Sequence, residues 1–197
     1  MSSDRLYGLV LSGGKSSRMG SDKSTIAYHG IPQREHLYHL LNQVCDKTFL
    51  SVRTDQVQEL PNDIPVIVDK NEYKGPYNGL LSAHLDYPDA AWLVLACDLP
   101  LMDSAALGQL IAHRDPKKKA TAFATRESGL PEPLCAIWEP DGLKDSFLFL
   151  NNGTVTCPRK FLINSEVALV YPVNDKVLLN ANSKEDYEEA ISKLNSK

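Results

Sequence analysis

The sequence predicts an α/β protein built as a three-layer sandwich, in which a mostly parallel sheet is flanked by helices. Two observations predict this fold class. Short aliphatic runs such as 6–11 lack the alternation of a half-buried strand, which is typical of strands buried on both faces. These runs alternate along the chain with segments of helical periodicity, which favours right-handed crossovers between parallel strands. The length of 197 residues suits one domain, spanning 1–197.

The strand expected at 6–11 begins the first half of this fold. A short extended piece is expected at 24–30, where it ends in a turn. Pro32 then opens a helix, because apolar residues recur after it at the spacing of one helix face. The later elements expected in this half are strands at 48–52, 65–68 and 92–97, with a helix around 80–85.

A helix over 102–114 opens the second half, with Asp103 or Ser104 as its N-cap. Two strands should follow, separated by a loop at 126–133 that is rich in glycine and proline. The elements expected here are strands at 121–124, 134–138 and 167–171, and helices at 142–149 and from about 184 to 194.

Composition and charge exclude several classes of partner. A chain with 43% hydrophobic and 23% charged residues is typical of globular proteins, and a net charge of −4 gives no general attraction to nucleic acid or to anionic membranes. The first residues lack the apolar stretch of a leader, and no apolar run approaches the roughly 18 residues that span a bilayer. The four cysteines show no C-x-x-C spacing, and Cys97 and Cys135 fall in apolar runs. We therefore expect a cytoplasmic protein with reduced thiols.

A glycine-rich loop follows the first predicted strand. Its glycines let the backbone approach a ligand, its serines add hydroxyl donors, and its basic residues add positive charge. These groups together suit a polyphosphate. The residues of the loop are Leu11, Ser12, Gly13, Gly14, Lys15, Ser16, Ser17, Arg18, Met19, Gly20, Ser21, Asp22 and Lys23.

Two better-known phosphate loops do not fit this spacing. A Walker A loop needs G-x-x-x-x-G-K-[ST], but Gly14 stands where the lysine should be after Gly8 and Gly13. A dinucleotide fingerprint needs G-x-G-x-x-G, which Gly13, Gly14 and Gly20 do not form. The loop is thus a different kind of phosphate site.

Two aspartates follow other predicted strands. Asp69 ends the strand at 65–68, and Asp98 ends the strand at 92–97. If these strands are parallel to the first, both carboxylates meet the glycine-rich loop at the same edge of the sheet. A basic loop opposite carboxylates is what a metal-assisted reaction on a nucleoside triphosphate requires, because a carboxylate can hold the Mg²⁺ that bridges phosphate oxygens. Lone histidine pairs such as His36 and His39 lack a third ligand and predict no metal site.

The loop resembles the signature L-x-G-G-x-S-x-R-M-G-x-D-K of the nucleotidyltransferases, and most closely that of the molybdenum cofactor guanylyltransferase family. The resemblance extends to Gly75-Pro76 before Gly79 and to the C-D-x-P motif at 97–100. It implies a Rossmann-like sheet of the nucleoside-diphospho-sugar transferase type.

The resemblance also implies roles for single residues. Arg18, Lys23 and Asp98 correspond to catalytic positions, and Asp98 to the metal ligand. The positions that correspond to nucleotide contacts are Leu11, Ser12, Gly13, Gly14, Lys23, Asp69 and Asp98. Glu132-Pro133-Leu134 resembles the segment that borders the acceptor, and 179–182 resembles the N-x-N close of the family.

The implied reaction is a Mg²⁺-dependent transfer of GMP from GTP to molybdopterin, with release of pyrophosphate. The partners are then two small molecules, and transient contact with proteins of cofactor biosynthesis or acceptor proteins is left open. No general base is needed, because the attacking phosphate is already ionised near pH 7.

Three departures from the family pattern keep alternatives open. The segment 51–55 has Arg53 where the family often has a base-reading asparagine, Tyr77-Asn78 replaces a usual Leu-Ala, and 33–36 is unusually polar for the start of a helix. Arg53 leaves open a cytidylyltransferase acting on molybdopterin or on a sugar or polyol phosphate, and the other two departures leave open an altered acceptor or a new interface. A nucleotide-sensing protein without turnover is a further alternative.

Overall fold

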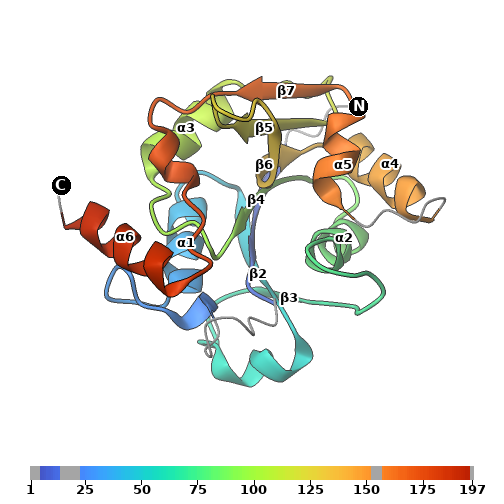
Figure 1. Cartoon of the computed structure of the whole chain (residues 1–197). Coiled ribbons are helices and arrows are strands. Elements are labelled where there is room, and N and C mark those ends of the chain that lie inside the picture. Colours follow the sequence, from blue (N-terminus) through green and yellow to red (C-terminus); the bar gives the residue numbers. More distant parts are fainter. Residues whose placement is uncertain (1–4, 14–22, 152–156, 196–197) are drawn as a thin grey trace.

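Seven strands form one sheet with helices on both faces (Figure 1). The structure, a computed structural model, describes residues 5–13, 23–151 and 157–195. The strand order is β3-β2-β1-β4-β6-β5-β7. The strands are β1 (Leu6–Leu11), β2 (Lys47–Val52), β3 (Val66–Val68), β4 (Ala91–Ala96), β5 (Ala120–Ala124), β6 (Pro131–Trp138) and β7 (Val167–Val170).

The sheet is mostly parallel, as the sequence predicts, but β6 runs against its neighbours. β1 pairs in parallel with β2 and β4, β2 with β3, and β5 with β7. β6 is antiparallel to both β4 and β5. The connection over 125–130 explains this reversal, because a crossover between parallel strands needs a dozen or more residues whereas a hairpin needs few.

The helices cover the sheet in two layers. α1 (Gln33–Asn42) and α3 (Ser104–Ala112) lie on one face, and α2 (Tyr77–Asp86), α4 (Pro140–Asn151) and α5 (Pro158–Ile163) lie on the other (Figure 1). Successive side chains of β4 point to opposite layers, and all of them are buried. This two-sided burial explains why the strand is aliphatic without alternation.

α6 (Lys184–Leu194) packs away from the sheet. Ser183 caps this helix by accepting a hydrogen bond from the Asp186 N–H at 3.1 Å. Ala190 of α6 packs against Tyr28 and Ala181 in a small separate cluster. The C-terminal segment is thereby held beside the chain that follows the glycine-rich loop.

Most of the expected elements are confirmed, including Asp103 as the N-cap of α3, but the expectation for 24–30 is wrong. That segment begins inside the 3-10 helix η1 (Lys23–Thr25) and ends in turns, with Gly30 at a φ of +81°. Three short elements were not expected because they are too brief to show periodicity. These elements are η2 (Thr54–Glu59), η3 (Asp175–Leu178) and α5. None of the described helices is long and apolar enough to cross a bilayer.

α2 approaches the ends of β1 and β2 very closely. A Cβ placed on Gly79 would lie 2.1 Å from Ser51 Oγ and 2.8 Å from Leu11 Cδ2. No other residue type fits at this position without displacing one of these groups. The last glycine of the Gly75-Pro76-x-x-Gly79 segment is therefore required by packing.

We predict that Gly79→Ala lowers the free energy of unfolding by about 1–3 kcal/mol, because the added methyl group overpacks the contact with β2. Gly108→Ala is the matched control, since Gly108 lies in α3 with nothing within 4 Å of its would-be Cβ. The control should stabilise the protein by about 0.5–1 kcal/mol. Urea unfolding measures both changes, and equal effects of the two substitutions would contradict the packing account.

His36 sits in the first turn of α1 with its ring stacked on His29. The ring centroids are 3.6 Å apart and the planes are 12° from parallel. Burial, reinforced by His29 and His39, lowers the pKa of His36 from 6.5 to about 4. The folded protein therefore keeps His36 neutral at pH values where the unfolded chain protonates it.

We predict that His36 lowers the free energy of unfolding as the pH falls from about 6.5 to about 4, because the unfolded chain takes up a proton at this residue before the folded protein does. His36→Phe keeps an aromatic ring against His29 and removes the titration. The variant should lose less free energy of unfolding than the wild type between pH 7.5 and pH 4.5 in urea titrations. Equal losses in the two proteins would contradict the assignment.

Candidate active site

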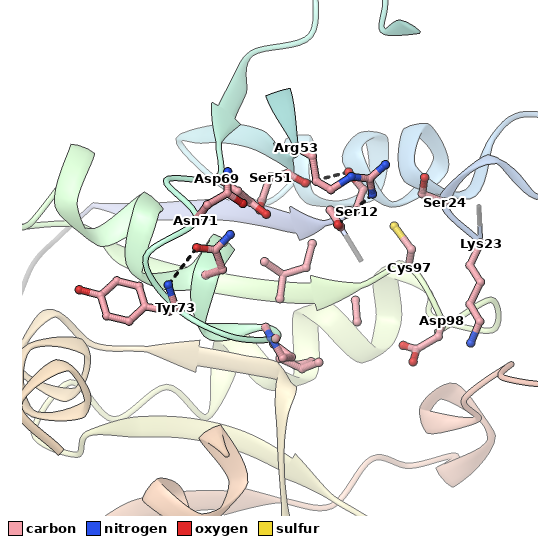
Figure 2. A pocket seen from close by; sticks show the side chains of 18 of the residues that line it. Ser12, Lys23, Ser24, Ser51, Arg53, Asp69, Asn71, Tyr73, Cys97 and Asp98 are labelled. Carbon is pink, nitrogen blue, oxygen red and sulfur yellow. Dashed lines mark hydrogen bonds between the residues drawn. The ribbon is translucent and has the colours of Figure 1, made fainter. Parts of the chain in front are cut away.

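A cavity of about 580 Å³ lies at the carboxyl ends of the parallel strands (Figure 2). Its volume is in the range of pockets that bind small molecules. The predicted residues that line it are Leu11, Ser12, Gly13, Lys23, Asp69 and Asp98. Gly14 and Arg18, also predicted for the site, lie outside the described residues.

The start of the glycine-rich loop is fixed by the end of β2. The Ser12 N–H and its Oγ both donate to the Ser51 carbonyl, at 3.0 and 2.8 Å. The Gln56 amide of η2 donates to the Ser12 carbonyl at 3.3 Å. The backbone that enters the loop is thus held rigidly on one side of the cavity.

Asp69 closes β3 beside this backbone. Its Oδ1 accepts a hydrogen bond from Ser51 Oγ at 2.7 Å, and a Cβ on Gly13 would lie only 2.5 Å from its Oδ2. Burial raises the pKa of Asp69, while hydrogen bonds from Ser51 and Asn78 and the charge of Arg53 oppose this shift. The Asp69 carboxylate thus lies against Gly13 at the start of the glycine-rich loop, where its oxygens can accept hydrogen bonds.

The side chain of Arg53, which also lines the cavity, supports the start of the glycine-rich loop. Its Nη1 donates to the Gly13 carbonyl at 3.0 Å. Its Nε and Nη2 pair with both carboxylate oxygens of Asp55, at 3.0 and 3.1 Å. This fork geometry fixes the guanidinium in place, so the residue has a clear supporting role where the family often has an asparagine.

The two residues of the second departure from the family pattern, Tyr77 and Asn78, lie in different places, one in the core and one at the cavity. Tyr77 is fully buried among the α2 packing residues, whereas Asn78 is 8% exposed and lines the cavity. Asn78 Oδ1 accepts a hydrogen bond from the Tyr73 N–H at 3.4 Å. Asn78 thereby ties the loop after β3 to the first turn of α2.

Asp98 stands at the other wall of the cavity, just after β4. Its Oδ1 is buried and has no hydrogen-bond partner in the part of the chain that the structure describes. Burial raises the pKa of Asp98, and the nearby positive charge of Lys23 lowers it. Figure 2 shows the two side chains side by side, and Lys23 Nζ donates to Asn182 Oδ1 at 2.6 Å. The N-x-N segment thus holds the lysine beside the aspartate.

These groups fit a magnesium ion that arrives with a nucleotide. A buried carboxylate oxygen without a partner is costly, and a cation would satisfy it. Among residues 5–13, 23–151 and 157–195, no group of three or more His, Cys, Asp or Glu side chains could hold a metal alone. Mg²⁺ commonly binds through one or two carboxylates together with substrate phosphates and water, and a single carboxylate such as that of Asp98 would meet this requirement.

Several contributors to the site were not identified from the sequence. Ser51, Gln56 and Asn78 carry the hydrogen bonds that hold Ser12 and Asp69 in place. Ser51 could have been found, because it is the register partner of Leu11 at the same carboxyl edge. Gln56 has no sequence signal of its own, and Asn78 stood out in the sequence only as a departure from the family pattern.

The chain is similar to known proteins in sequence and in fold. The sequence pattern of the MobA-like NTP transferase domain matches residues 8–153. The chain is 41% identical over 183 residues to a molybdenum cofactor biosynthesis bifunctional protein of Synechocystis sp., covering 92% of this chain and 52% of that protein. This chain therefore spans about half the length of that relative.

Two further similarities extend over nearly the whole chain. A molybdenum cofactor guanylyltransferase of Pseudomonas fluorescens is 28% identical over 180 residues, covering 90% of this chain and 89% of that one. The crystal structure of molybdopterin-guanine dinucleotide biosynthesis protein A from Archaeoglobus fulgidus superimposes with a TM-score of 0.79 at 18% identity, covering 97% and 100% of the two chains. The fold predicted from the sequence is thus confirmed, and the chain belongs to the family of MobA-like NTP transferase domains.

Proposed function

We propose that this protein transfers GMP from GTP to the terminal phosphate of molybdopterin and releases pyrophosphate. One observation supports the proposal most directly. The carboxylate of Asp98, whose Oδ1 has no hydrogen-bond partner among the described residues, lines a cavity together with Lys23, and the opposite wall of that cavity begins the glycine-rich loop. The names of the Synechocystis and Pseudomonas relatives support the choice of substrates.

In this proposal, different residues of the cavity bind the phosphates and the nucleoside. The glycine-rich loop from Gly14 onward holds the phosphates, and Lys23 and Arg18 supply positive charge. Asp69 is assigned to the nucleoside, because a carboxylate repels phosphate but accepts hydrogen bonds from ribose hydroxyls or base N–H groups. Its bond from Ser51 fixes the direction in which it accepts.

Asp98 would hold Mg²⁺, with Lys23 next to it. When bound, the ion would neutralise charge on the phosphate oxygens. Lys23 neutralises further charge on the same phosphates, and its bond to Asn182 keeps it aimed across the cavity. The two groups hold the triphosphate against the loop backbone.

The chemistry needs no general base in the protein. An ionised phosphate oxygen of molybdopterin attacks the α-phosphorus of GTP, and the bond from that phosphorus to the bridging oxygen of the β-phosphate breaks. Pyrophosphate leaves with that oxygen and its electron pair. Lys23 and Arg18 stabilise the charge that builds on the leaving group, which lowers the barrier for transfer.

All four cysteines are free, which supports a reducing cytoplasm as the place of reaction.

Two other functions are less well supported. The cytidylyltransferase alternative rested on Arg53, whose guanidinium is engaged with Asp55 and the Gly13 carbonyl. A sensor without turnover would not need Lys23 and an unpartnered Asp98 side by side. The second activity of the bifunctional relative is not assigned to this chain, which spans about half of that protein.

We predict that Asp98→Asn lowers pyrophosphate release from GTP and molybdopterin on the order of 100-fold or more, because the neutral amide is a poor ligand for Mg²⁺. Circular dichroism should show an unchanged fold. Asp145→Asn is the control, since Asp145 pairs with Lys119 outside the cavity, and it should leave turnover unchanged. Wild-type turnover of Asp98→Asn at saturating Mg²⁺ would remove Asp98 from the metal role.

Base identity is tested by isothermal titration with Mg²⁺. The proposal expects GTP to bind and CTP to bind far more weakly. Binding of CTP in preference to GTP would replace the guanylyltransferase assignment by the cytidylyl alternative, and GTP binding without pyrophosphate release in a folded protein would favour the sensor.

A further inference from the structure

The polar first turn of α1 contacts the loop that carries Asp98. Gln33 opens the helix and is fully buried. Its side-chain Nε2 donates to the Leu99 carbonyl at 3.2 Å, and its backbone N–H donates to the Ile26 carbonyl at 2.9 Å. One residue thereby connects the Asp98 loop to the segment that follows Lys23.

Three consecutive carbonyls of the Asp98 loop are held in this way, each by a different part of the chain. The Asp98 carbonyl accepts from the Ala181 N–H at 2.8 Å. The Leu99 carbonyl accepts from Gln33, and the Pro100 carbonyl accepts from His29 Nε2 at 2.9 Å. We call this set of contacts the 98–100 clamp. Bonds on three successive carbonyls restrict the backbone rotations that set the direction of the Asp98 side chain.

Stability alone does not explain the glutamine in the clamp. Gln33 Oε1 is buried and has no hydrogen-bond partner among residues 5–13, 23–151 and 157–195, which is unfavourable. Turning the amide over would bring Oε1 against the Leu99 carbonyl, where two acceptors repel each other, so the donor must face the loop. A methionine would fill nearly the same space without an unsatisfied polar atom. Packing alone would therefore not favour a glutamine here. The amide contributes the hydrogen bond to the Leu99 carbonyl, and its unsatisfied Oε1 is the cost.

His29 is held in place for the neighbouring bond. Its ring stacks on His36, with centroids 3.6 Å apart and planes at 12°. A ring nitrogen that faces a carbonyl oxygen must carry a hydrogen, so the contact to Pro100 fixes the proton on Nε2. The stack therefore orients the second donor of the clamp.

We propose that Gln33, assisted by His29, is a positioning residue that aims the Asp98 carboxylate at the metal and sets its place relative to Lys23. The proposal rests on the proposed function, in which Asp98 holds Mg²⁺. Its physical basis is the pair of bonds from one buried residue to Leu99 and Ile26, which connects the backbone on the Asp98 side with the backbone on the Lys23 side. Groups that orient a metal ligand typically change metal affinity 10- to 100-fold when they are removed.

The test uses Gln33→Met and measures metal affinity rather than turnover. Mn²⁺ is titrated into the full chain bound to a non-hydrolysable GTP analogue, and free Mn²⁺ is followed by electron paramagnetic resonance. The variant should weaken Mn²⁺ binding about 10-fold or more. Its affinity for the analogue in EDTA should stay within about two-fold of the wild type, because the clamp acts on the metal ligand.

Gln109→Met is the matched control. Gln109 also donates to a backbone carbonyl, that of Tyr171 at 2.9 Å, and its Oε1 accepts from the Val173 N–H at 3.1 Å, outside the cavity. This variant should bind Mn²⁺ like the wild type. His29→Phe is the second test variant, since it keeps a ring against His36 and removes the donor to Pro100, and it too should weaken Mn²⁺ binding.

The outcomes separate the clamp from the proposed function. If Gln33→Met does not fold in thermal unfolding, His29→Phe decides the question. Wild-type Mn²⁺ affinity in the folded test variants would overturn the clamp alone, and so would an equal loss of analogue binding in EDTA. A wild-type chain that binds no GTP analogue would overturn the proposed function, and the role of the clamp with it.

Discussion

The parallel pairing of β1, β2, β3 and β4 is the constraint on which the site depends. Because these strands run in the same direction, the polar groups that follow them meet at one edge of the sheet and must be satisfied there. Ser12, Ser51 and Asp69 satisfy one another. Asp98 does not find such a partner for its buried Oδ1. The polar groups at this edge that are left without a partner are therefore the ones available to recognise a charged ligand.

Rigid support surrounds this unsatisfied group. The loop that carries Asp98 is held from α1 and from the segment before α6, and the entrance of the glycine loop is held by β2 and η2. The departures from the family pattern belong to this support. Arg53 braces the Gly13 carbonyl, and Tyr77 fills the core under α2. The residues at these departures therefore support the site in this chain.

The sequence was sufficient to predict the fold class and the wall-forming residues, for a physical reason. Buried parallel strands are recognisable as aliphatic runs, and the polar residues after them are local in sequence, so Ser12, Asp69 and Asp98 could be placed at one edge. The reversal of β6 and the short helix α5 gave weaker signals, since neither has a long periodic pattern. The bond from Lys23 to Asn182 joins residues 159 positions apart, and that from Gln33 to Leu99 joins residues 66 apart. Such pairings depend on the completed packing and have no local signature.

In the proposed function, this edge binds a nucleoside triphosphate with its phosphates between the glycine loop and Lys23. A crystal structure with a non-hydrolysable GTP analogue and Mg²⁺ tests it most directly. We expect the triphosphate between the glycine loop and Lys23, the nucleoside beside Asp69, and a metal ion on the carboxylate of Asp98. Phosphates lying against Asp69, or a metal ion bound away from Asp98, would contradict it.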